Sequence, residues 1–152
     1  MKNTNIYPLF LLILIGFLST YANAADTDEI QPSDTALVMF LTNTDPMIAG
    51  HGVHFASRMA MEDRSVTIIL VGEAGRLGLK AWSSNVSNVE NIPLHEVLQD
   101  VIKHGGKVLM TPYTLMSFNA NAEDLIQGVS LPKDPISMHN HMFAANTKLL
   151  VW

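Results

Sequence analysis

Short apolar runs alternate with helix-like segments along residues 35–152, and this alternation constrains the fold more than any other feature of the sequence. Continuous apolar runs are typical of strands that are buried on both faces, and strands that alternate with helices usually pair in parallel. The sequence therefore predicts an α/β fold, a three-layer α/β/α sandwich on a mostly parallel sheet of about five strands. The expected strands cover residues 35–42, 65–71, 107–110, 129–131 and 148–152.

Two of the expected helices carry clear signals. Thr44-Asp45-Pro46 predicts the start of a helix that reaches residue 62, because a capping side chain precedes a proline at the first helical position. Residues 93–104 have apolar side chains at helical spacing and stop at Gly105-Gly106. Shorter helices are expected at 76–82, 122–127 and 136–146, turns at 72–75 and 132–135, and loops at 83–91 and 111–121.

Residues 1–24 have the three parts of a secretory signal peptide. Lys2 supplies the positive start, and residues 9–18 form an apolar run that is shorter than the roughly 20 residues needed to span a bilayer. Ala22-Asn23-Ala24 is a cleavage site of the A-x-A type. We expect cleavage after Ala24, a flexible leader over residues 25–34, a domain over residues 35–152, a periplasmic or secreted protein, and no stable membrane anchor after cleavage. An uncleaved N-terminal anchor is the alternative.

The composition excludes several classes of function. The chain has 152 residues, a formal net charge of −5 and no cysteine. The lack of cysteine excludes disulfides, thiolate zinc sites and thiol catalysis. The mild acidity argues against a nucleic-acid-binding protein, which would carry a clustered basic face.

Four stretches of the sequence resemble the DsrE/DsrF-like family, the sulfur-relay fold of the TusBCD proteins. They are TALVMFLTNTDP, SVTIILVGEAGRLGLKA, LHEVLQDVIKHGGKVLMTPY and NAEDLIQGVSL, and the closing KLLVW suits the family's last strand. The resemblance implies a DsrE/F-like α/β domain. It also implies assembly, either as a homo-oligomer or as a hetero-oligomer with DsrE-like paralogues.

The sequence departs from this family at the position that carries its chemistry. Family members that transfer sulfur have a cysteine just after the strand that corresponds to residues 107–110. Thr111 and Thr114 align with the cysteine positions of that loop. A hydroxyl cannot hold a persulfide, because sulfur relay needs a nucleophilic thiolate. The resemblance therefore implies the fold without cysteine-based sulfur transfer.

Ligands of open parallel sheets bind beyond the carboxyl ends of the strands. The segments 43–54, 111–119 and 134–142 each follow an expected strand. An apolar patch of Tyr113, Met116 and Phe118 is expected to contact another subunit, with a lid over a small ligand as the alternative. The expected ligand-binding residues are Asn43, Thr111, Tyr113 and Thr114.

Histidine and methionine side chains gather in two of these segments. Met47, His51 and His54 have the spacing of one helix face, and His139 and His141 lie between Met138 and Met142. Imidazole and thioether ligands suit copper, and thioether favours Cu(I). We expect these residues, Met47, His51, His54, His139 and His141, to be the candidate ligands of a soft metal such as copper. Core packing of the methionines and exposed surface histidines are the alternative.

Three functions remain open from the sequence. The first is an accessory or binding protein without cysteine-based sulfur transfer, with copper as its possible ligand. The second is an enzyme that acts on a small ligand and uses His51 or His54 as a base, which would need an acidic partner in a closed pocket. The third is a non-catalytic subunit of a hetero-oligomeric sulfur-relay complex. We favour the accessory or binding role over an enzyme, and whether the protein is an enzyme stays open.

Overall fold

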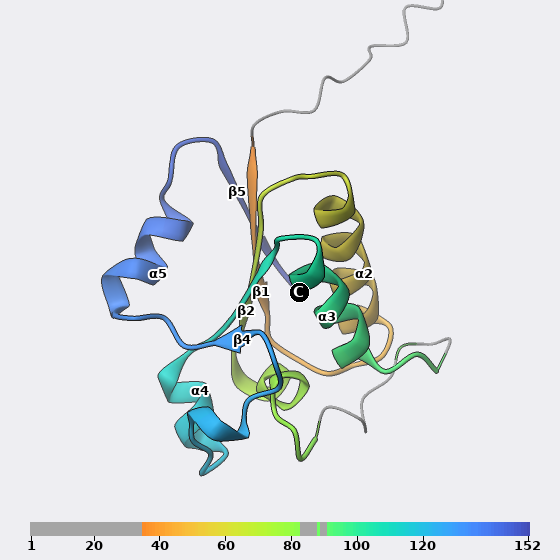
Figure 1. Ribbon diagram of the computed structural model, residues 1–152, viewed down its shortest axis with the longest axis vertical. Helices are drawn as coiled ribbons and strands as arrows, with labels where there is room; N and C mark the ends of the chain where they lie inside the picture. Colours follow the sequence, from red (N-terminus) through yellow and green to blue (C-terminus); the bar gives the residue numbers. More distant parts are fainter. Residues whose placement is uncertain (1–34, 83–87, 89–90) are drawn as a thin grey trace, which may run out of the picture. The chain divides into compact units, whose positions relative to one another are not determined.

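The computed structural model describes residues 35–82, 88 and 91–152, so the predicted signal peptide, the leader and most of the 83–91 loop lie outside the described residues. Five parallel strands form one sheet in the order β4-β3-β2-β1-β5 (Figure 1). The predicted strands are confirmed, with bounds that differ by at most one residue at each end. They are β1 (Ala36–Leu41), β2 (Val66–Leu70), β3 (Lys107–Met110), β4 (Val129–Ser130) and β5 (Thr147–Val151).

Helices cover both faces of the sheet, as the predicted three-layer sandwich requires. On one face, α2 (Ile48–Met61) and α3 (Leu94–Lys103) enclose the main core with strand residues such as Met39 and Ile68. On the other face, α5 (Pro135–Met142) packs Met138 and Met142 near Val38 and Ile69 (Figure 1). The two sets of strand residues alternate along each strand, because successive side chains of a strand point to opposite faces.

Asp45 holds the turn that leads into α2 as the sequence predicts, although α2 itself begins at Ile48, two residues after Pro46. The Asp45 carboxylate accepts hydrogen bonds through Oδ1 from the backbone N–H groups of Met47, at 3.0 Å, and Ile48, at 2.9 Å. This satisfies two of the donors that a helix start leaves without partners. Asp45 is therefore a structural cap.

The prediction of a loop over residues 111–121 is wrong for its first half. Residues Pro112–Ser117 form a short helix, α4. The Thr111 hydroxyl accepts a hydrogen bond from the Thr114 N–H, and proline follows at the first helical position. A capping residue followed by proline is the same signal that marks α2, but the short length and polar residues of this segment hide it.

Other boundaries also differ from the predictions. A 3₁₀-helix, η1 (Gly72–Gly78), replaces the expected turn at 72–75 and begins at Gly72, which has a φ of +56°. The helix expected at 76–82 is wrong, because η1 ends at Gly78 and residues 79–82 are not helical. The helix predicted at 122–127 is a single 3₁₀ turn, η3 (Ala122–Asp124), and α5 ends at Met142. Within the described ranges, no helix is long and apolar enough to cross a membrane.

Candidate functional site at the carboxyl edge of the sheet

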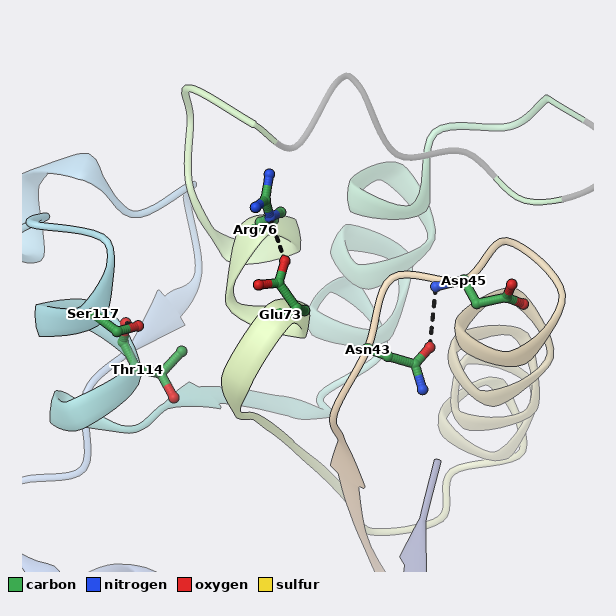
Figure 2. A network of polar contacts seen from close by, with 6 residues as sticks. All are labelled: Asn43, Asp45, Glu73, Arg76, Thr114 and Ser117. Atoms are coloured by element: carbon green, nitrogen blue, oxygen red, sulfur yellow. Dashed lines mark hydrogen bonds and ion pairs between the residues drawn. The ribbon is translucent and has the colours of Figure 1, made fainter.

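The segments that follow β1, β2 and β3 meet at one edge of the sheet (Figure 2). Backbone pairing continues past the strands, since the Val71 N–H donates to the Leu41 carbonyl at 3.0 Å and the Thr111 N–H to the Leu70 carbonyl at 3.4 Å. The Gly72 N–H then donates to Thr114 Oγ1 at 3.3 Å, which joins η1 to α4. This is the edge at which open α/β sheets bind ligands.

Thr111 and Thr114 use their hydroxyls to hold this edge together. Thr111 Oγ1 lies 2.8 Å from Thr114 Oγ1 and accepts the Thr114 N–H at 3.2 Å. Thr114 is only 5% exposed, and its carbonyl accepts a hydrogen bond from the Ser117 hydroxyl at 2.7 Å. The two predicted ligand residues therefore lie together at the expected place, with their hydroxyls engaged in local hydrogen bonds.

The other two predicted ligand residues lie apart from this pair. Asn43 is half-buried in the loop after β1, and its side-chain oxygen accepts the Asp45 N–H at 3.0 Å (Figure 2). Tyr113 is 85% exposed on α4. Asn43 therefore shapes the entry to α2, whereas Tyr113 is available to a partner or ligand.

An arginine of η1, which the sequence analysis did not single out, occupies the same edge. Arg76 Nε lies 2.7 Å from Glu73 Oε2 (Figure 2). Its guanidinium carbon also lies 4.6 Å from the centroid of the Trp82 ring and 5.7 Å from that of Phe118. The spacing of three residues between Glu73 and Arg76 could have indicated the ion pair from the sequence. The contacts with the two rings could not be predicted in this way, because they depend on how η1 packs against α4.

The first histidine group lies on the early turns of α2. Met47, His51 and His54 are all exposed. The Asn88 side chain accepts the Ile92 N–H through Oδ1 at 2.9 Å, so its amide nitrogen faces His54 Nε2 at 2.7 Å. In this arrangement Nε2 accepts the hydrogen bond, and Nδ1 carries the ring proton. Among the described residues, neither imidazole contacts a carboxylate.

The second histidine group lies on the opposite face of the sheet. His139 and His141 belong to α5, and His141 is half-buried. Burial, together with the positive charge of Lys107, lowers the pKa of His141 below its ordinary value. The structure therefore does not bring the two groups together. Within the described part of the chain, no three His, Cys, Asp or Glu residues form a metal-binding group.

Comparisons with known proteins agree with the fold. No protein-family model matches the sequence, and no curated protein is significantly similar to it. Among solved structures, the YchN protein of E. coli matches with a TM-score of 0.61 and 13% identity, over 78% of this chain and 100% of YchN. MTH1491 of Methanobacterium thermoautotrophicum, a protein of unknown function, matches with a TM-score of 0.59 and 10% identity, over 78% of this chain and 99% of MTH1491. These likenesses support a DsrE-like fold.

Proposed function

We propose that the protein is an accessory or binding subunit with a DsrE-like fold that does not transfer sulfur through a thiol. The proposal rests on the hydrogen bonds that the Thr111 and Thr114 hydroxyls make. The Thr111 hydroxyl caps α4, and the hydroxyl of the nearly buried Thr114 accepts the backbone N–H of Gly72 in η1. A relay site needs a reactive thiolate at this position, whereas these hydroxyls stabilise the local fold.

The exposed surface of α4 supports assembly with another subunit. Tyr113 is 85% exposed and Met116 67% exposed, and both lie on α4 beside the half-buried Phe118. Neighbouring exposed apolar side chains often mark protein interfaces, and tyrosine and methionine are enriched there. A second copy of this chain or a DsrE-like paralogue would cover this surface.

Native mass spectrometry of the mature protein tests this assembly. We expect an oligomer for the wild type and a shift to the monomer for the double variant Tyr113→Ser with Met116→Ser. The control is Met61→Ser, which removes an exposed methionine from α2 and leaves α4 intact. An unchanged oligomeric state in the α4 double variant would refute the interface. A wild-type monomer that also fails to bind a cysteine-bearing paralogue would refute the accessory role.

We also propose that the chain is exported and cleaved after Ala24. The apolar run and the A-x-A site of the first 24 residues support this location. The mass and N-terminal sequence of protein purified from a periplasmic extract test it. A first residue of Ala25 is expected, whereas full-length protein in the membrane fraction would indicate an uncleaved anchor.

Copper binding is a second candidate function, and the exposure of Met47, His51 and His54 on the early turns of α2 favours it. A neutral imidazole has one acceptor nitrogen, and His54 Nε2 now accepts from Asn88, so copper binding by His54 requires that nitrogen to give up the hydrogen bond. We expect one Cu(I) per chain in native mass spectra, retained against a competing chelator and lost in His51→Ala with His54→Ala. The matched control is His139→Ala with His141→Ala on α5. Unchanged copper stoichiometry in the α2 variant would refute this assignment.

A further inference from the structure

A cleft of about 530 Å³ lies beside η1, between residues 79–82 and residues 118–124. Its size falls in the range of small-molecule sites, which is about 300–1,000 Å³. The lining residues that matter here are Leu79, Lys80, Trp82, Phe118, Asn119 and Asp124. None of them belongs to the metal or ligand residues expected from the sequence.

Hydrogen bonds fix the two walls of this cleft relative to each other. The Lys80 N–H donates to the Asp124 carbonyl at 2.9 Å, and the Ile126 N–H donates to the Gly78 carbonyl at 2.9 Å. Leu79 and Leu125 form an antiparallel bridge between these two bonds. A ligand would therefore meet a preformed site, which lowers the entropy that ordering the site would cost.

Two aromatic rings line the cleft and are themselves held in place. The Arg76 guanidinium lies over both Trp82 and Phe118 and forms an ion pair with Glu73. Trp82 remains 42% exposed, and Phe118 is half-buried. Fixed, partly exposed rings are surfaces on which a planar ligand can stack.

The polar side chains of the cleft offer both donors and acceptors. Lys80 Nζ donates to the Glu123 carbonyl at 2.6 Å, which leaves further donors on the ammonium. One Asp124 oxygen accepts the Asn121 N–H at 2.9 Å, and no donor in the described part of the chain contacts the other. The Asn119 side chain is exposed and has no hydrogen-bond partner among the described residues, so its amide can both donate and accept.

We infer that this cleft binds a planar heteroaromatic small molecule. The ring stacks on Trp82 and Phe118, and the donors and acceptors at its edge meet Asn119, Lys80 and Asp124. Because Asp124 offsets the positive charge of Lys80, the cleft favours a ligand with neutral donors and acceptors over a strongly anionic ligand. This inference goes beyond the proposed accessory role and does not depend on assembly.

Fluorescence titration with riboflavin, and calorimetric titration with adenosine, test the inference on the intact mature protein. Both probes are planar and carry ring donors and acceptors, and stacking on tryptophan quenches riboflavin emission. Trp82→Ala is expected to weaken binding by about tenfold or more, because stacking on an aromatic side chain supplies much of the affinity of such ligands. Trp82→Phe should restore part of it.

Two further variants separate the edge contacts from a general loss of structure. Asn119→Gly removes only the amide group, since Asn119 has a φ of +51° and glycine adopts this conformation freely. We expect it to weaken binding by about fivefold with little change in Tm. Phe55→Ala removes an exposed aromatic residue of α2 that does not line the cleft, and it should leave binding unchanged.

Each outcome decides the inference. Saturable binding that falls in Trp82→Ala and Asn119→Gly, but not in Phe55→Ala, supports it. No saturable binding of either probe overturns it, as does binding that Trp82→Ala leaves unchanged. Loss in Trp82→Ala alone overturns the edge contacts. Native mass spectrometry of the same samples gives the oligomeric state at which each probe binds. Failure of the proposed interface is therefore distinguishable from failure of this site.

Discussion

Gly75 is the position where the packing between η1 and α4 can be tested most sharply. A Cβ atom added there would lie 2.4 Å from Thr114 Cγ2 and 2.7 Å from Phe118 Cε2. Thr114 cannot easily yield, because it is nearly buried and hydrogen-bonded to Gly72 and Thr111. The Gly75→Ala substitution therefore adds a methyl group where no space exists.

The expected loss follows from two opposing effects. Overpacking costs about 1–3 kcal/mol, and two contacts this short against fixed neighbours suggest the upper end. Replacing glycine by alanine restricts the unfolded chain, which returns about 0.4–1 kcal/mol. We expect the free energy of unfolding to fall by about 2 kcal/mol, which lowers the Tm by roughly 8 °C for a domain of this size.

Urea denaturation followed by circular dichroism measures this loss, and a second substitution tests its cause. Thr114→Ser removes Cγ2 but keeps the hydroxyl, so the double variant Gly75→Ala with Thr114→Ser should recover about 1 kcal/mol relative to additive behaviour. A Gly75→Ala protein within about 0.5 kcal/mol of the wild type would refute the reasoning. Strictly additive single variants would show that Thr114 is not the obstacle.

The remaining predictions concern hydrogen bonds and one titrating group. Thr114→Val removes the acceptor of the Gly72 N–H and should cost about 1 kcal/mol in urea denaturation, and a cost below about 0.5 kcal/mol would contradict this bond. Thr111→Ala removes the cap of α4 and should cost about 1 kcal/mol, with faster hydrogen exchange in α4; unchanged exchange would count against the cap. Because the pKa of His141 is lowered, the folded state resists its protonation, so the free energy of unfolding should fall as the pH drops below 6.5. His141→Gln should reduce this loss and Lys107→Gln should reduce it partly, whereas an unchanged pH profile in both variants would exclude His141 as its source.

The layers of the fold could be predicted because their signals are local. The run 65–71 is apolar throughout and becomes a strand whose five residues are all buried. The apolar spacing of α3 likewise places Leu94, Val97, Leu98 and Val101 in the core. The helix α4 was missed because it has only six residues, and such a helix depends on its cap and on packing against η1 more than on periodicity.

The strand order, in contrast, lies in contacts between distant segments. β5 returns beside β1 after α5 has crossed the face opposite α2 and α3. From β1 to β4 each new strand is added on the same side of the previous one, whereas β5 is added on the opposite side, next to β1. Because crossovers between parallel strands are right-handed, this reversal places the connecting helix α5 on the other face of the sheet. That reversal separates His51 and His54 from His139 and His141, and spacing within the sequence carries no trace of it.

The same reasoning explains which part of the candidate site the sequence could reveal. The rule that ligands bind at the carboxyl ends of strands placed Thr111 and Thr114 at the correct edge. It could not show that their hydroxyls hold η1 and α4 together, because the partner at Gly72 is 42 residues away. The arrangement of Arg76 over Trp82 and Phe118 arises from the same junction, since η1 follows β2 and α4 follows its neighbour β3. The junction of η1 and α4 therefore engages the hydroxyls at the cysteine positions and also positions the rings of the neighbouring cleft. A substitution at Thr114 would consequently disturb the cleft that we propose as a binding site.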